Sequence, residues 1–133
     1  MIAVDTSAIV AIALGEPERP AFRAAILAAG TAFISTASVL ETRMVLYGRR
    51  GPRAVVLADD LFRLPLFEIV PPGPAELEAA YGAFVVYGKG SGHPASLNYG
   101  DLFAYALAKV RGLPLLFKGL DFVETDIVPA IAA

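Results

Sequence analysis

Short apolar segments alternate with helical segments along this chain, and that alternation constrains its fold more than any other feature. Segments of three or four mostly apolar residues, each ended by a polar residue or a proline, indicate strands at Ile2–Val4, Ala32–Ile34, Phe67–Val70 and Leu115–Phe117. Starting and stopping residues indicate helices at Ala8–Leu14, Pro20–Ala29, Thr36 to about Tyr47, Pro52–Arg63, Pro74–Tyr87 and Tyr99–Arg111. Strands that alternate with helices form a parallel sheet with helices on both faces. The sequence therefore predicts a single α/β domain over residues 1–133, with Ile127–Ile131 as an additional last strand.

Four acidic residues fall at one edge of such a sheet. Right-handed crossovers bring the carboxyl end of each strand and the start of the next helix to the same edge, where ligands bind in open α/β folds. Asp5 follows the first strand, and Glu41 lies near the start of the helix after the second. Asp101 lies in the first turn of the helix that leads into the fourth strand, and Asp121 follows that strand. We expect these four residues, called here the acidic quartet, to converge.

A convergent acidic quartet needs something that offsets its repulsion. Two carboxylates about 4 Å apart repel by roughly 4 kcal/mol at an effective dielectric constant near 20. In proteins, a bound divalent cation with oxygen ligands usually offsets such repulsion. Because no histidine or cysteine cluster accompanies the acids, Mg²⁺ or Mn²⁺ is favoured over zinc.

Each acid also has a purely structural interpretation. Asp5 is suited to cap the first helix, and Asp121 is an acceptable loop residue. Ser38 to Glu41 fits the capping-box pattern, and Asn98 to Asp101 resembles it with a shorter acid. Such roles explain the residues singly and leave their convergence unexplained.

Composition limits the location and the chemistry of the protein. Without cysteine, the chain has no disulfides, no thiol chemistry and no cysteine-bound zinc. No apolar run reaches the roughly 18 residues of a membrane span, and Met1–Val4 lacks the basic start of a signal peptide, so we expect a cytoplasmic protein. Hydrophobic residues make up 56% of the chain, against roughly 45–50% in soluble domains. This surplus predicts an apolar surface that a partner covers.

The charge distribution allows a nucleic-acid partner despite the acidic balance of the whole chain. A net charge of −2 argues mildly against such a partner. The segment from Arg43 to Arg53 nevertheless concentrates positive charge and contains no acidic residue. Its four arginines, called here the basic stretch, are Arg43, Arg49, Arg50 and Arg53. It is suited either to RNA phosphates or to a solvated helix end.

Three motifs, in order along the chain, resemble those of PIN-domain nucleases. Residues 2–8 (IAVDTSA) resemble the opening motif of that family, and residues 92–108 (GHPASLNYGDLFAYALA) resemble the central motif of VapC-type toxins. Residues 115–122 (LLFKGLDF), continuing to residues 125–127, resemble the C-terminal motif. The resemblance covers the whole chain and implies a PIN domain with a parallel sheet of about five strands.

The same resemblance implies a function. VapC-type toxins are endoribonucleases that hydrolyse RNA phosphodiester bonds with Mg²⁺ or Mn²⁺ and are neutralised by a small cognate antitoxin of the VapB type. The resemblance also leads us to expect a homodimer.

The family's acidic residues correspond to the quartet, with Asp5 and Asp101 as the chief metal ligands and the hydroxyl of Thr6 or Ser7 as a possible support. One departure is Leu120, where the family often has a polar or acidic residue; it leaves Asp126 as a rival to Asp121 for the fourth role.

Two other classes of function place acidic residues in an α/β fold of this kind. A phospho-acceptor receiver domain needs paired acids after the first strand and an acceptor aspartate after the third, but Asp5 is unpaired and residues 71–74 are Pro-Pro-Gly-Pro. A catalytically silent PIN scaffold stays open, although the complete quartet argues against it. His93, the sole histidine, lies in a loop with no evident partner, so it is not predicted to act as a general base.

Overall fold

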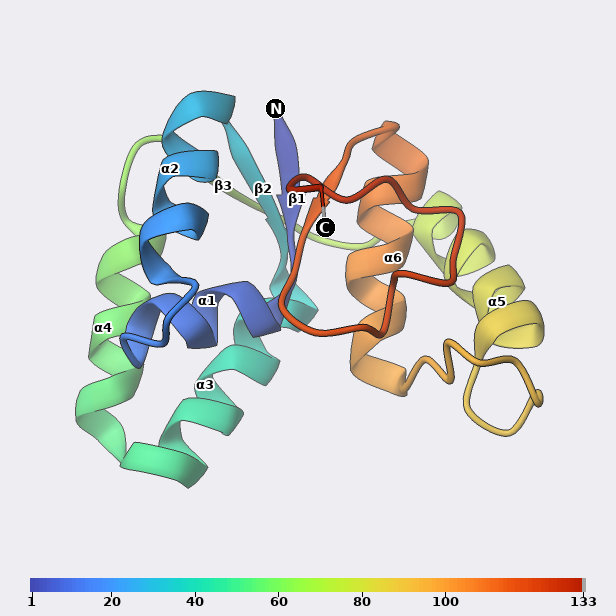
Figure 1. The fold of residues 1–133 in the computed structure, drawn as a ribbon, viewed down its shortest axis with the longest axis horizontal. Helices are drawn as coiled ribbons and strands as arrows, with labels where there is room; N and C mark the ends of the chain where they lie inside the picture. The colour runs from blue at the N-terminus through green and yellow to red at the C-terminus, as the bar shows by residue number, and fades with distance from the viewer. Residues whose placement is uncertain (133) are drawn as a thin grey trace.

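A parallel four-stranded sheet forms the centre of the protein in the computed structural model, which describes residues 1–132 (Figure 1). The strands are β1 (Ile2–Val4), β2 (Ala32–Ser35), β3 (Phe67–Val70) and β4 (Leu115–Leu116), in the spatial order β3-β2-β1-β4. The helices are α1 (Thr6–Ala13), α2 (Arg19–Ala29), α3 (Thr36–Arg50), α4 (Pro52–Phe62), α5 (Pro74–Tyr87) and α6 (Tyr99–Arg111). These bounds lie within a few residues of those expected from the sequence.

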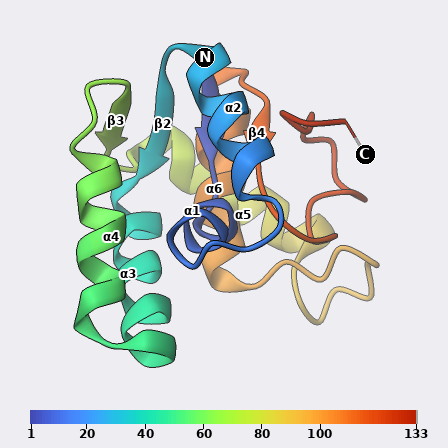
Figure 2. The same ribbon diagram turned by 60° about the vertical axis from the view of Figure 1, so that its left-hand side comes forward.

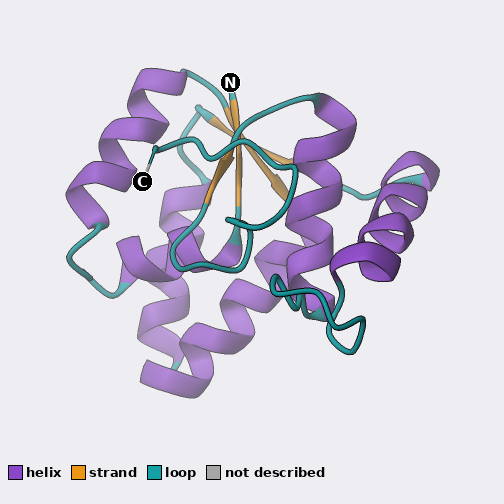
Figure 3. Cartoon of the chain, turned by 45° about the vertical axis from the view of Figure 1, so that its right-hand side comes forward, coloured by secondary structure: helices purple, strands orange, loops and turns teal. Residues whose placement is uncertain are grey.

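Helices cover both faces of the sheet, as predicted, because alternate strand residues point to opposite faces. Val4 and Ile34 pack into a core formed with α1, α2, α3 and α4. Ala3 and Phe33 pack into a second core with α6 and Ala83 of α5. Figures 2 and 3 show the two groups of helices with the strands between them. No helix within residues 1–132 combines the length and the apolar character needed to cross a membrane.

The prediction of a fifth strand at Ile127–Ile131 is wrong. This segment touches β4 through a single parallel bridge between Leu115 and Pro129. The amide of Leu115 donates to the carbonyl of Val128 at 2.9 Å, and the amide of Ala130 donates to the carbonyl of Leu115 at 2.8 Å. β4 itself is two residues long, so pairing with this segment stops after one bridge.

The strand order brings the carboxyl ends of three strands together. β1 pairs with β2 on one side and with β4 on the other. Helices α1 and α3 begin directly after β1 and β2, and α6 begins at the same end of the sheet, the lower end in Figure 1. The residues expected to form a site are therefore brought to one edge.

Candidate functional site

Asp5 is held rigidly between β1 and α1. It is 4% exposed and caps α1 by accepting a hydrogen bond from the Ser7 amide at 3.0 Å and another from the Ser7 hydroxyl at 2.6 Å, both on Oδ2. The Ser7 hydroxyl oxygen in turn accepts from the amide of Lys118, just beyond β4, at 2.9 Å. Ser7 thus links the Asp5 carboxylate, at the end of β1, to the backbone just beyond β4. Both hydrogen bonds from Ser7 fall on Oδ2 of Asp5, so neither of them uses Oδ1.

Asp101 is fixed by the start of α6. Its Oδ2 accepts from the amide of Asn98 at 2.9 Å, and its own amide donates to Oδ1 of Asn98 at 2.9 Å, which completes a reciprocal capping box. The residue is 8% exposed. Asp101 therefore caps α6 and also lines the site, because the capping hydrogen bonds orient the same carboxylate.

The acidic quartet lines a single cleft of about 540 Å³ at the carboxyl edge of the sheet. The structure thus brings together all four acids that the sequence singled out. Side chains that share this cleft with the quartet are those of Thr6, Ser7, Val10, Glu16, Val45, Arg49, Asn98 and Lys118.

The two buried acids of the quartet are electrostatically strained. Burial, reinforced by the negative charge of Glu41 and opposed by the Ser7 hydrogen bonds, raises the pKa of Asp5 from 3.8 to about 6. Burial raises the pKa of Asp101 from 3.8 to about 7, reinforced by the charges of Asp5, Asp121 and Glu41. Within residues 1–132, no lysine or arginine forms an ion pair with a member of the quartet. The cleft therefore favours a cation.

The donor set suits a hard divalent ion. Within residues 1–132, no three acidic or histidine side chains already stand in a geometry that would hold a metal ion. Magnesium, however, is commonly bound through one or two carboxylates and keeps several of its waters. Asp5 and Asp101 offer such a pair, each held by hydrogen bonds on one oxygen.

Thr6 and Asp126 form hydrogen bonds with residues outside the quartet. The Thr6 hydroxyl donates to the carbonyl of Ser38 at 3.1 Å and so joins α1 to α3, although Thr6 also lines the cleft. Asp126 accepts from the Tyr105 hydroxyl and from the Lys109 ammonium, each at 2.6 Å, and does not line the cleft. Asp126 thus anchors the C-terminal segment to α6, while Asp121 lies with the other acids.

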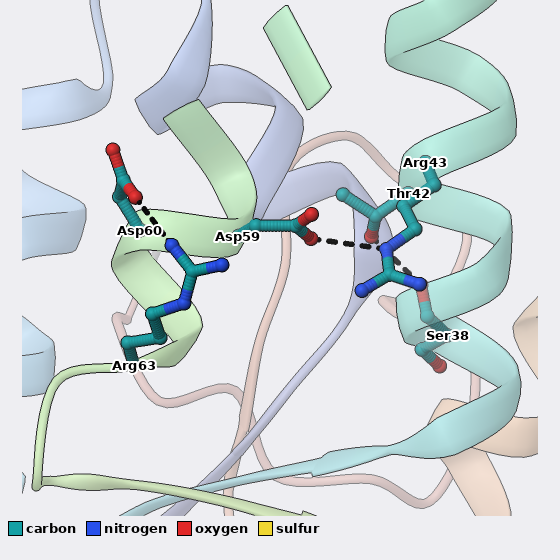
Figure 4. A network of polar contacts seen from close by, with 6 residues as sticks. All are labelled: Ser38, Thr42, Arg43, Asp59, Asp60 and Arg63. Carbon is teal, nitrogen blue, oxygen red and sulfur yellow. Dashed lines mark hydrogen bonds and ion pairs between the residues drawn. The ribbon is translucent and has the colours of Figure 1, made fainter. Parts of the chain in front are cut away.

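The basic stretch is divided in the structure. Arg43 donates to Oδ1 of Asp59 on α4 at 3.0 Å, a pair that joins the two helices (Figure 4). Arg49 lines the cleft from the last turn of α3. Arg50 and Arg53 are exposed around the α3–α4 turn. Arg49 is therefore the member of the basic stretch placed nearest to the quartet.

Other residues near the cleft have clear structural partners. Glu16, in the loop after α1, lines the cleft together with Lys118. The Lys118 ammonium lies 3.4 Å from Glu16 and 2.9 Å from Glu18, which fixes the loop after α1 to the loop after β4. His93 accepts from the Ala95 amide at 3.0 Å on Nδ1 and packs against Tyr87, so it stabilises its loop away from the cleft.

Comparison with known proteins agrees with this architecture. The sequence profile of the PIN domain matches residues 2–128. Ribonuclease VapC30 of Mycobacterium tuberculosis is 44% identical over 124 residues, which cover 93% of this chain and 94% of the relative. Two solved structures share the fold: the M. tuberculosis toxin VapC20, described as cleaving the sarcin-ricin loop, and a toxin–antitoxin complex from Klebsiella pneumoniae.

The structural agreement extends over nearly the whole chain. VapC20 has a TM-score of 0.77 at 20% identity, with 96% of this chain and 97% of the other covered. The Klebsiella protein has a TM-score of 0.70 at 18% identity, with both chains covered fully. From the profile match and the extent of its identity to VapC30, the chain belongs to the PIN-domain family, with ribonucleases of the VapC type among its relatives.

Proposed function

We propose that this protein is a VapC-type toxin, an endoribonuclease that hydrolyses RNA phosphodiester bonds with Mg²⁺ or Mn²⁺. The observation that carries the proposal is the pair of buried carboxylates, Asp5 and Asp101, whose pKa values are raised by burial and by the other acids of the quartet. Perturbed carboxylates that converge in a cleft are typical of functional sites. The ribonuclease VapC30, which is similar over nearly the whole chain, supplies the substrate class.

In this proposal Asp5 and Asp101 hold the ion, because they are buried, preoriented and free of ion pairs within residues 1–132. When bound, the ion supplies positive charge beside the scissile phosphate and makes a water molecule more acidic. Glu41 and Asp121 orient the attacking water or complete the ligand shell. Arg49 and Lys118, which line the same cleft, position the phosphates that flank the cleaved bond.

A cleavage assay on total RNA tests the proposal. The purified protein is expected to cut RNA in Mn²⁺ or Mg²⁺ and to stop in excess chelator. Asp101→Asn should be folded and inactive, because asparagine keeps the size of the side chain and loses its charge. Asp60→Asn is the control, since Asp60 is an exposed acid paired with Arg63. A folded parent protein that never cuts RNA would favour the silent scaffold, and cutting in chelator would refute the metal mechanism.

We also propose a cognate antitoxin of the VapB type as partner. Exposed Leu40, Met44 and Tyr47 give α3 an apolar face, and Val45 and Arg49 of the same helix line the cleft. The cleft-lining residues lie on a different face of α3 from the apolar residues, so we expect the antitoxin segment to cover the apolar face and to continue around the helix to the quartet. There an arginine of the antitoxin would neutralise the carboxylates in place of the metal. Expression with the gene product encoded beside this protein should yield a soluble, inactive complex, whereas expression alone should be toxic.

A homodimer is proposed through the surface of α5 and α6. A groove of about 640 Å³ lies between these helices, and the exposed apolar residues Leu77, Tyr81 and Tyr99 line it. Glu76 is the one charged side chain that the described residues contribute to this lining, which suits contact with a second, identical surface. Sedimentation of the parent protein and of Tyr81→Glu should show a dimer that the substitution converts to a monomer.

A further inference from the structure

Gly100 is an unexpected residue at the second position of α6. Glycine destabilises a helix relative to alanine, because it loses more backbone freedom on folding. A positive φ angle often explains a glycine, but Gly100 does not have a positive φ angle. Another cause must therefore account for a glycine between Tyr99 and Asp101.

The cause lies in the Glu41 side chain, which occupies the place where a side chain of residue 100 would begin. A Cβ atom at Gly100 would lie 2.6 Å from Cδ and 2.9 Å from Oε1 of Glu41, and would overlap Oε2. In proteins, non-bonded heavy atoms essentially never lie within 3.0 Å of a Cβ atom. The Glu41 carboxylate therefore rests directly on the backbone of α6, one residue before Asp101.

Other helical glycines provide a contrast. A Cβ atom at Gly48 in α3 or at Gly82 in α5 would meet nothing within 4 Å. The close approach at Gly100 is thus particular to the point where α3 and α6 meet at the cleft. It brings Glu41 close enough for its charge to raise the pKa values of both Asp5 and Asp101.

We propose that Gly100 is a positioning residue: its missing side chain lets the Glu41 carboxylate lie beside Asp5 and Asp101, where the metal and the attacking water are arranged. This inference rests on the proposed function and adds a requirement for a residue that carries no functional group. It explains why the start of α6 contains a glycine that helix stability alone disfavours.

The substitution Gly100→Ala should separate activity from stability. The obstructed atoms are the end of a flexible side chain, so Glu41 can turn away and the domain can still fold. The unfolding temperature should stay equal or rise, because alanine is the better helix residue. Cleavage should nevertheless slow by about 100-fold, the loss typical of a catalytic group misplaced by about 1 Å.

A double-mutant cycle tests whether Gly100 acts through Glu41. Cleavage rates and the rise in unfolding temperature caused by Mn²⁺ are measured for the parent, Gly100→Ala, Glu41→Ala and the double variant. We expect Gly100→Ala to reduce both quantities in the parent and to change neither further in the Glu41→Ala background. Gly82→Ala is the matched control and should retain the parent's rate and its response to Mn²⁺.

Two results would overturn the inference: parent-like cleavage and Mn²⁺ response in Gly100→Ala, or an equal loss from the added methyl group whether or not Glu41 is present. The second result would mean that the methyl group disturbs α6 by itself. If the parent protein cut no RNA, the proposed function would fail separately, and the Mn²⁺-dependent unfolding temperatures of the four proteins would still decide the role of Gly100.

Discussion

Replacing Asp5 by asparagine is expected to stabilise the metal-free protein, although Asp5 caps α1 and is almost completely buried. The carboxyl group ionises near pH 3.8 in the unfolded chain and near pH 6 in the folded protein. Ionisation therefore opposes folding increasingly between pH 4 and pH 6, and fully above pH 6. A difference of about two pKa units corresponds to about 3 kcal/mol of unfolding free energy.

Asparagine removes this penalty while keeping the helix cap, since it caps helices about as well as aspartate. Asp5→Asn should therefore gain about 3 kcal/mol at pH 8 in chelator, which is roughly 10 °C in unfolding temperature for a chain of this size. The gain should shrink as the pH falls from 6 to 4 and disappear below pH 3.8, where the carboxyl is protonated in both states.

Thermal and urea unfolding, followed by circular dichroism at pH 8 and at low pH, measure this effect. Asp60→Asn serves as the control; it replaces an exposed acid and should change stability by less than about 0.5 kcal/mol. Equal or lower stability of Asp5→Asn at pH 8, without metal, would refute the view that the buried carboxylate is strained.

Further predictions concern the fourth acid and the basic stretch. Asp121→Asn should reduce cleavage strongly with little change in stability, whereas Asp126→Asn should lower stability by about 1–2 kcal/mol and leave cleavage nearly intact, because it breaks the bonds to Lys109 and Tyr105. Parallel cleavage and unfolding assays check this, and the opposite pattern would assign the fourth role to Asp126. Replacing Arg49 by alanine should weaken RNA binding and lower the slope of its salt dependence by up to about 0.7. Binding measured across a salt series checks this, and an unchanged slope would place Arg49 away from the RNA.

The fold was largely predictable because its signals are local. Each strand is a short apolar segment, and the helices begin and end at caps, prolines and glycines that act within a few residues. The exception was the segment from Ile127 to Ile131, whose apolar residues suggested a strand. Its pairing depended on the length of β4, and the three-dimensional arrangement limits that strand to two residues.

Convergence of the quartet was predictable from topology, because strand ends and helix starts share one edge of a parallel sheet. Contacts between segments that are distant in the sequence were not predictable. The bond from the Lys118 amide to Ser7 and the pair between Arg43 and Asp59 join residues whose separation in sequence carries no periodic signal. The contact between the Glu41 carboxylate and the backbone at Gly100 was not predictable either, since a glycine in a helix does not indicate which distant side chain requires it.

Calorimetric titration of the RNA-free protein with Mn²⁺, in buffers that differ in ionisation enthalpy, tests the central claim most directly. If Asp5 and Asp101 hold the ion, binding must release their protons. With pKa values of about 6 and about 7, release should be about one proton per ion at pH 6.5 and close to zero at pH 8.5, and Asp101→Asn should abolish or greatly weaken binding. Binding that releases no proton at pH 6.5, or that is unchanged in Asp101→Asn, would contradict a metal site built on these two carboxylates.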